Sequence, residues 1–336
     1  MNFFKSIKEL FPIILSVILF SCNNQDNVEI ITGKFINRTS DTLNIMYYDG
    51  DKGKYEFVHS IYLKEDNSFT DTLTLDQGYY KLSSGKNSTS IFLQKGFNLN
   101  IAGKHLGDTI YYTGKGANEN NYLIEKDFLD ERIKEKQDFY YVSTLTEDEF
   151  LTLYDSLYKV QIELYNKHKN GFNEDFSFIE KEGIKLMKNH YIASFEEIKQ
   201  YLSGDRNYKV SGSFPNPYTN LNLNDDRLLK LYIYKPVIDR YIHSTLGAER
   251  KSDSYILKYL DKLDEKISNP KIKEELAFDI GINRLKQVKN LKPVYSKLTS
   301  LISNEEYLNK IENAYNNIKR ILPGEASPQF TCIDMN

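Results

Sequence analysis

The stretch Gly114–Asn118, with the sequence GKGAN, separates two parts of the chain that differ in hydrophobic period. Before it, apolar and polar residues alternate, as in Phe97–Ile101 (FNLNI), which is the period of a strand with one buried face. After it, apolar residues recur every three or four positions, which is the period of an amphipathic helix. The sequence therefore predicts a multidomain α+β protein, with a β domain over residues 30–117 and an all-α domain over 118–322.

The β domain is expected to be antiparallel. Turn signals such as Asp49-Gly50, Gln77-Gly78 and Lys95-Gly96 separate short alternating runs, for example Leu43–Tyr47. At the usual ~8–12 residues for a strand and its turn, roughly eight strands fit this region. Strands that alternate cleanly are typical of antiparallel sheets with one solvated face. This pattern favours an antiparallel β-sandwich or an open barrel.

The second half of the chain carries the start and stop signals of helices. Thr146–Glu149 (TEDE) has the form of a capping box, and Asn170-Gly171 supplies a stop after the apolar positions that follow it. Apolar residues then recur at helical spacing from Ile184 to Leu202, and Leu322-Pro323-Gly324 closes the last helix. Further helices are expected over residues 227–244, 253–267, 271–288, 294–301 and 304–321.

The N-terminus has the parts of a secretory signal: Lys5 and Lys8, the apolar run Leu10–Phe20, and Ser21 before Cys22. The apolar run is shorter than the about 20 residues that span a bilayer. Leu19–Cys22 resembles a lipobox, which implies that Cys22 is acylated and becomes the first mature residue. Residues 1–21 would then be a lipoprotein signal peptide and residues 22–29 a polar tether, although a buried N-terminal helix with an incidental cysteine remains the alternative.

Composition limits the other partners and the redox chemistry. The formal net charge is -3 and no Lys/Arg-rich patch is present, so no nucleic-acid partner is expected. The two cysteines are Cys22 and Cys332, so acylation of the first excludes an internal disulfide in the mature chain. With several acyl chains on Cys22, the protein is expected to be anchored to a membrane of the cell envelope, facing the periplasm or the surface.

Three stretches resemble the Bacteroidota lipoproteins that carry a C-terminal TlpA-like thioredoxin domain. They are the β region from Thr32–Phe35 to Gln94–Leu99, the junction Gly114–Leu123, and the segment Leu322–Phe330 with its Gly-x-x-x-Pro-x-Phe pattern. The resemblance implies that residues 323–336 begin a truncated thioredoxin-like domain. It also implies a disulfide reductase of the envelope that acts on exported client proteins.

The sequence departs from this family at the residues that carry the chemistry. The Trp-Cys-x-x-Cys motif of the family is absent from these 336 residues, which contain no Trp. Dithiol exchange needs one thiolate to attack and a second thiol to resolve the mixed disulfide, and Cys332 alone supplies only one. No catalytic residue is therefore carried over, and the chain is interpreted as the anchoring and accessory part of an oxidoreductase. The alternative is a non-enzymatic envelope lipoprotein with a binding role.

Other candidate sites have weak signals. Cys332 is either a lone redox thiol or a small strand residue, and no activating group lies near it in sequence. The histidines show no metal-ligand spacing, and Gly103–Gly116 has no phosphate-binding pattern, so neither a metal nor a cofactor is expected. The five histidines are His59, His105, His168, His190 and His243.

Three threonines match the Asp-Thr-apolar acceptor pattern of O-glycosylation in Bacteroidota. They are Thr42, Thr72 and Thr109, each preceded by an aspartate. Alternating strands produce the same pattern at turn exits, so the match has two interpretations. We treat the three residues as possible glycosylation sites.

Overall fold

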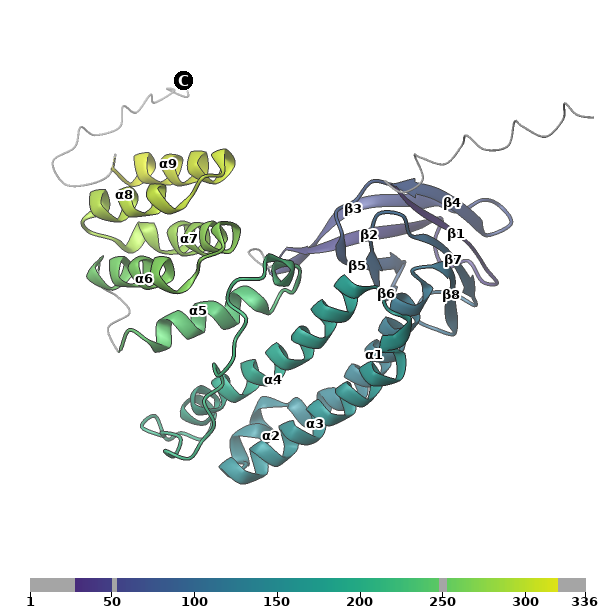
Figure 1. Ribbon diagram of the computed structural model, residues 1–336. Coiled ribbons are helices and arrows are strands. Elements are labelled where there is room, and N and C mark those ends of the chain that lie inside the picture. Colours follow the sequence, from purple (N-terminus) through teal and green to yellow (C-terminus); the bar gives the residue numbers. More distant parts are fainter. Residues whose placement is uncertain (1–27, 50–52, 248–252, 320–336) are drawn as a thin grey trace, which may run out of the picture. The chain divides into compact units, whose positions relative to one another are not determined.

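The computed structural model describes residues 28–49, 53–247 and 253–319, and its strands all precede its helices (Figure 1). The predicted α+β class is therefore confirmed. The predicted signal peptide, most of the predicted tether, the predicted thioredoxin-like segment, Cys22 and Cys332 all lie outside the described residues.

Eight short strands in the described residues form two sheets of four. One sheet has the order β4-β1-β7-β8 and the other has the order β3-β2-β5-β6. Both sheets bury alternate residues along their strands, such as Ile31, Leu99 and Ile101 in the first and Leu43 and Ile45 in the second. The strands are β1 (Glu29–Phe35), β2 (Thr42–Asp49), β3 (Lys54–Tyr62), β4 (Ser68–Leu73), β5 (Gly78–Ser84), β6 (Asn87–Leu93), β7 (Asn98–Gly103) and β8 (Ile110–Lys115).

One strand pair departs from the antiparallel prediction. Strand β1 pairs with β7 in parallel, with Ile30 opposite Asn98, whereas the β1–β4, β7–β8, β2–β5 and β5–β6 pairs are antiparallel. Parallel neighbours need a long crossover connection, and the strands of the second sheet supply much of it here. The expectation of a wholly antiparallel domain is wrong at this pair, because alternation reports a buried face and not a strand direction.

The junction Gly114–Asn118 contains a turn whose backbone conformation requires glycine. Gly114 and Gly116 have φ values of +94° and +97°, in the region that L side chains rarely adopt. A Cβ at Gly114 would also lie 2.1 Å from the Asn98 carbonyl oxygen, and one at Gly116 would lie 2.3 Å from the Phe97 ring. The chain can therefore turn sharply out of β8, and α1 begins at Ala117.

Two asparagines in the first turns of α1 (Ala117–Lys134) hold the helix against the sheets. The Asn120 side chain is fully buried, accepts from the Phe92 backbone N–H at 2.8 Å and donates to the Phe92 carbonyl at 3.0 Å. Asn121 makes the same two bonds with the backbone of Tyr112, at 2.8 and 2.9 Å. Each side-chain amide thus bonds to both the N–H and the carbonyl of one strand residue. Asn120 and Asn121 of the junction therefore have a structural role.

Most of the helices agree with the predicted ranges to within a few residues, with two exceptions. Helix α4 begins ten residues before Ile184, and the range 227–244 contains a short 3-10 helix, Asp226–Lys230, followed by α5. The capping box at Thr146 is confirmed: the Glu149 backbone N–H donates to the Thr146 hydroxyl at 3.3 Å, and the Thr146 backbone N–H donates to the Glu149 carboxylate at 2.8 Å. The helices after α1 are α2 (Phe139–Thr144), α3 (Glu147–His168), α4 (Glu174–Leu202), α5 (Tyr234–Ser244), α6 (Asp253–Lys266), α7 (Pro270–Arg284), α8 (Leu291–Leu301) and α9 (Glu305–Lys319).

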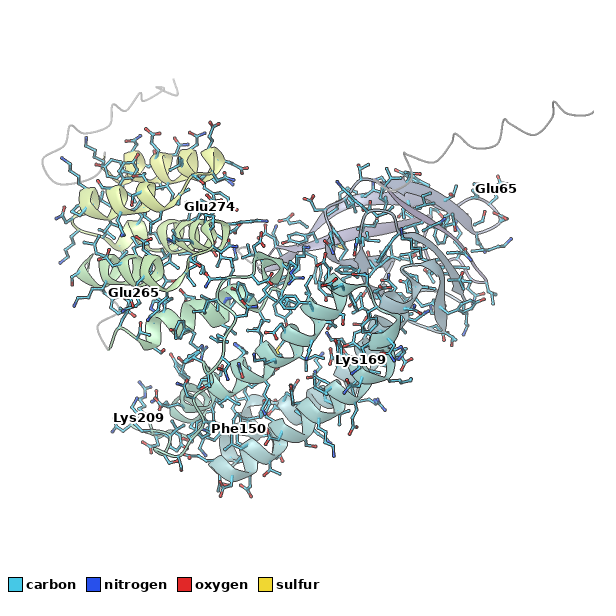
Figure 2. The ribbon with its side chains drawn as sticks, in the orientation of Figure 1. Glu65, Phe150, Lys169, Lys209, Glu265 and Glu274 are labelled. Carbon is cyan, nitrogen blue, oxygen red and sulfur yellow. The ribbon has the colours of Figure 1, made fainter. Side chains whose placement is uncertain are left out.

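The described residues divide into two compact units. The first contains residues 28–47 and 57–124, and the second contains 48–49, 53–56, 125–247 and 253–319. The first turns of α1 thus belong to the sheet unit, and the described tip residues of the β2–β3 hairpin belong to the helical unit. Within the helical unit, α1–α4 enclose an aromatic cluster around Phe150 (Figure 2), while α5–α9 enclose a separate apolar cluster with part of α4.

Candidate functional site

A group of polar side chains lies among α1, α3 and α4 of the helical unit and is the most unusual chemical feature of the described chain. We call it the tyrosine–carboxylate cluster. Its members are Lys126 and Asp130 of α1, Tyr154 of α3, Glu180 and Tyr191 of α4, and Tyr232, which lies shortly before α5.

A buried ion pair forms one side of the cluster. The Lys126 ammonium contacts the Glu180 carboxylate, whose side chain is only 1% exposed. An isolated buried carboxylate is unfavourable by several kcal/mol, so Lys126 neutralises a charge that could not otherwise remain there. Sequence periodicity would place an apolar residue at this position, because Glu180 lies four residues after Phe176 and four before Ile184, both buried.

Asp130 supplies a second carboxylate, and it forms no ion pair among the described residues. It accepts a long hydrogen bond from the Gln161 side-chain amide, at 3.4 Å. Burial raises the pKa of the Asp130 carboxyl, and the negative charges of Asp127 and Glu180 raise it further, against the opposing effect of Lys126. The surroundings of Asp130 therefore disfavour its ionised form compared with an exposed aspartate.

Two tyrosines of the cluster, Tyr154 of α3 and Tyr191 of α4, pack against each other. Tyr154 is 2% exposed and packs on Tyr191 with 4.7 Å between ring centroids. The Tyr154 hydroxyl has no hydrogen-bond partner in the part of the chain that the structure describes, which is uncommon for a buried phenol. Burial raises the pKa of Tyr191, and the charge of Asp130 adds to that rise. The two phenols and the Asp130 carboxylate thus form one electrostatic group.

Tyr232 combines an exposed ring with a desolvated hydroxyl. Its side chain is 62% exposed, yet burial is the largest cause of the rise in its pKa, followed by the nearby Tyr191. Lys126 opposes this rise, and Asp130 and Tyr48 contribute to it. The Tyr232 ring also meets Tyr48 edge-on, with 5.9 Å between centroids.

A second polar network, around His243, has the appearance of an acid–base relay. Its Nδ1 lies 2.6 Å from the Tyr255 hydroxyl, its Nε2 lies 3.4 Å from Asp239, and the Tyr259 hydroxyl donates to Asp239 at 2.8 Å. The His243, Tyr255 and Tyr259 side chains are buried, so this network is closed to a substrate. We assign it the structural role of joining α5 to α6.

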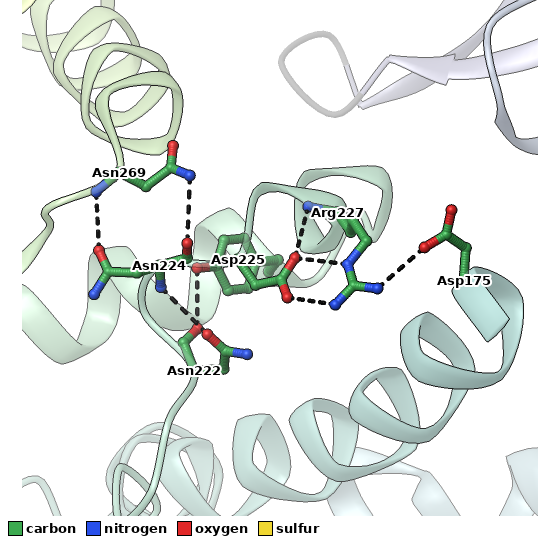
Figure 3. Close-up of polar contacts among 7 residues, drawn as sticks. Asp175, Asn222, Asn224, Asp225, Arg227 and Asn269 are labelled. Atoms are coloured by element: carbon green, nitrogen blue, oxygen red, sulfur yellow. Dashed lines mark hydrogen bonds and ion pairs between the residues drawn. The ribbon is translucent and has the colours of Figure 1, made fainter.

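Arg227 organises another fully paired polar group (Figure 3). Its guanidinium donates to Asp225 at 2.7 and 2.9 Å and to Asp175, at the start of α4, at 3.0 Å. The hydrogen bonds that Asp225 accepts from Arg227 lower the pKa of the Asp225 carboxyl. Beside them, the Asn224 side chain accepts from the backbone N–H groups of Ser268 and Asn269, at 2.7 and 3.0 Å. These contacts join the starts of α4 and α7 and leave no free group for chemistry.

An open groove of about 820 Å³ runs between α1 and α3. Its floor is apolar, with the exposed side chains of Phe128 and Val160, and its rim is charged. At one end Glu125 pairs with Lys167 at 2.6 Å and with His168 at 3.1 Å. The lining residues are Glu125, Phe128, Leu129, Glu131, Arg132, Val160, Glu163, Leu164 and Lys167. The groove carries no reactive group.

Metal binding has no support in the described ranges. No group of three or more histidine, cysteine, aspartate or glutamate side chains in residues 28–49, 53–247 and 253–319 is placed to hold an ion. Within the same ranges, no helix has both the length and the apolar character that crossing a bilayer requires.

The three candidate glycosylation threonines differ in their surroundings. Thr72 and Thr109 are exposed, and the backbone N–H of each donates to the side chain of the preceding aspartate, at 2.8 and 2.7 Å. Thr42 is half-buried, and its N–H instead donates to the Ser40 hydroxyl at 3.4 Å. The shared geometry of Thr72 and Thr109 makes them the better candidates of the three.

We therefore expect glycan mass at Thr72 and Thr109, and none at Thr42, in protein isolated from its native host. Exposure decides this, because the modifying enzyme must reach the hydroxyl oxygen. Intact-mass spectrometry of the double variant Thr72→Val/Thr109→Val should show the loss of the glycan, whereas Thr42→Val should keep it. A wild-type mass equal to peptide plus lipid would rule the modification out.

Comparison of the chain with known proteins gives no match: no family model, no curated protein and no solved structure is similar to it.

Proposed function

We propose that this chain is the accessory part of an envelope thiol–disulfide oxidoreductase, a lipoprotein anchored through Cys22. In this proposal the first domain is a β-sandwich, the helical domain follows it, and residues 323–336 begin a thioredoxin-like catalytic domain. The order of the parts supports it: two sheets, then the helices, then the Pro-x-Phe segment that follows α9. This order is the one that the family resemblance implies.

The observation that carries the proposal is the junction Gly114–Leu123. Its glycines make the turn out of β8, and Asn120 and Asn121 bond to the backbones of Phe92 and Tyr112. Gly114, Gly116, Asn120 and Asn121 of this motif thus each have a geometric role. A resemblance at residues with structural roles supports a shared fold more strongly than a resemblance in composition does.

The described domains have a binding or positioning role in this proposal. The sequence has only two cysteines, Cys22 and Cys332, and both lie outside the described residues. Dithiol exchange needs a pair of thiols, so the two domains would hold or orient the client while another domain carries out the exchange. The second candidate function, which the sequence also allows, is an envelope lipoprotein that binds a ligand without any redox step.

The test compares two lengths of protein in an insulin-reduction assay with dithiothreitol. The chain ending at Asn336 should match the no-protein control, because Cys332 has no second thiol to resolve a mixed disulfide. A product of the same gene that continues beyond Asn336 into Trp-Cys-x-x-Cys should accelerate the reduction.

Two outcomes would overturn the proposal. A stop codon directly after the codon for Asn336 would favour the second candidate function, ligand binding by a non-enzymatic envelope lipoprotein. A rate enhancement by the shorter chain that is lost in Cys332→Ser would make Cys332 a monothiol catalyst and the chain itself an enzyme.

A further inference from the structure

We propose that the open groove between α1 and α3 is the surface through which two copies of this chain form a dimer. In this dimer the two α1 helices lie antiparallel across a two-fold axis. The inference goes beyond the proposed function and does not depend on it. It follows from three properties of the groove: its apolar surface, the order of the charges along α1, and the pairing of those charges.

The apolar surface of the groove has the spacing of a helix–helix contact. On each helix, four of the lining residues fall at positions i, i+3, i+4 and i+7, so they share one face. They are Glu125, Phe128, Leu129 and Arg132 on α1 and Val160, Glu163, Leu164 and Lys167 on α3. The Phe128 side chain is 55% exposed and Val160 is 39% exposed. A further helix laid along the groove would remove this apolar surface from water.

The order of the charges along α1 selects a second copy, and selects the antiparallel direction. The α1 face begins with the anion Glu125, continues with the apolar pair Phe128 and Leu129, and ends with the cation Arg132. A two-fold axis midway between residues 128 and 129 places Glu125 of each copy opposite Arg132 of the other, and Phe128 opposite Leu129. A two-fold interface needs such self-complementarity, because the same patch serves both subunits. Parallel helices would instead place like charges together at both ends.

The pairing of these charges leaves Arg132 available for the other copy. Glu125 pairs with Lys167 at 2.6 Å and with His168 at 3.1 Å. The exposed Arg132 side chain, in contrast, forms no ion pair or hydrogen bond within residues 28–49, 53–247 and 253–319. A carboxylate has about four acceptor sites, so Glu125 can accept from the guanidinium of the other copy and keep its own pairs. The fork of a guanidinium matches a carboxylate in geometry as well as in charge.

The contact is short, which sets the expected strength of the dimer. Residues 125 to 132 span about 10 Å of helix axis. Such a contact belongs to the small class of interfaces that form transient complexes. We therefore expect monomer and dimer to exchange, with a dissociation constant in the micromolar range.

The first experiment is disulfide cross-linking of the full chain in membranes of the expressing cell, in a Cys332→Ser background. Phe128→Cys places two thiols beside the two-fold axis, where helices in contact bring them within reach of a disulfide. We expect a covalent dimer on a non-reducing gel. Phe139→Cys on α2 is the matched control, because Phe139 is 54% exposed and lies outside the groove. The background chain without an added cysteine gives the baseline.

The second experiment exchanges the charges and measures sedimentation velocity of the mature chain in detergent at several concentrations. Arg132→Glu alone, or Glu125→Arg alone, places like charges opposite each other at both ends of the contact. The dissociation constant of each variant should therefore rise at least about tenfold. An equimolar mixture of the two variants restores opposite charges at both ends, so mixed dimers should form within about threefold of the wild-type affinity. Lys134→Glu, on the same helix with a side chain 74% exposed, is the control and should leave the dissociation constant unchanged. Thermal melting establishes that each variant is folded.

Four results would each overturn the inference. They are a wild-type chain that stays monomeric at every concentration, a dimer that neither charge variant weakens, equal cross-linking at positions 128 and 139, and a mixture that dimerises no better than its two components. A dimer that survives both charge variants would lie on another surface. None of these readouts uses insulin reduction, so their outcome and the test of the proposed function are independent.

Discussion

Replacing Phe195 with alanine is expected to lower the free energy of unfolding of the helical unit by about 3–5 kcal/mol. Phe195 is fully buried on α4, where its ring stacks on Phe150 with 4.0 Å between centroids and on Phe214 at 5.6 Å. The Tyr208 ring meets it edge-on at 6.1 Å. Removing the ring takes away its transfer free energy and leaves a cavity among side chains that can close only partly.

Chemical denaturation of the Phe195→Ala variant, followed by circular dichroism at a helical wavelength, gives this difference. Phe139→Ala on α2 is the matched control, because that ring is 54% exposed and its loss should cost no more than about 0.5 kcal/mol. Similar losses in the two variants would show that Phe195 does not lie at the centre of a packed core.

Replacing Lys126 with methionine is expected to lower the free energy of unfolding by about 3–5 kcal/mol at neutral pH. The change removes the ammonium that pairs with the buried Glu180 carboxylate, so the buried charge loses the compensation that Lys126 supplies. The defect is therefore electrostatic and not one of volume, since methionine fills nearly the same space as the lysine stem.

A second substitution tests this reason. The double variant Lys126→Met/Glu180→Leu should recover most of the loss, because an apolar pair of similar volume can replace a buried ion pair at little or no cost. Lys134→Met on the same helix is the control: its pair with Glu131 is exposed on both sides and should contribute no more than about 1 kcal/mol. A double variant as unstable as Lys126→Met alone would point to packing instead.

The candidate site could hardly be predicted from the sequence. Lys126, Asp130, Tyr154, Glu180 and Tyr232 come from four separate segments, and none of them has a motif around it. The available signal was Glu180, a charged residue on the apolar face of α4 between Phe176 and Ile184. Such a position predicts a buried charge with a partner, but it does not identify the partner, because the partner lies on another helix.

By itself, the sequence determined where the strands end and the helices begin. The alternation up to Phe97–Ile101, the glycines of Gly114–Asn118 and the capping box at Thr146 are local signals, and each acts within a few residues of itself. Only the tertiary structure decided that β1 lies parallel to β7, and that Lys126 of α1 meets Glu180 of α4. A periodic pattern specifies which face of an element is buried, whereas the element that covers this face depends on contacts between residues far apart in the chain.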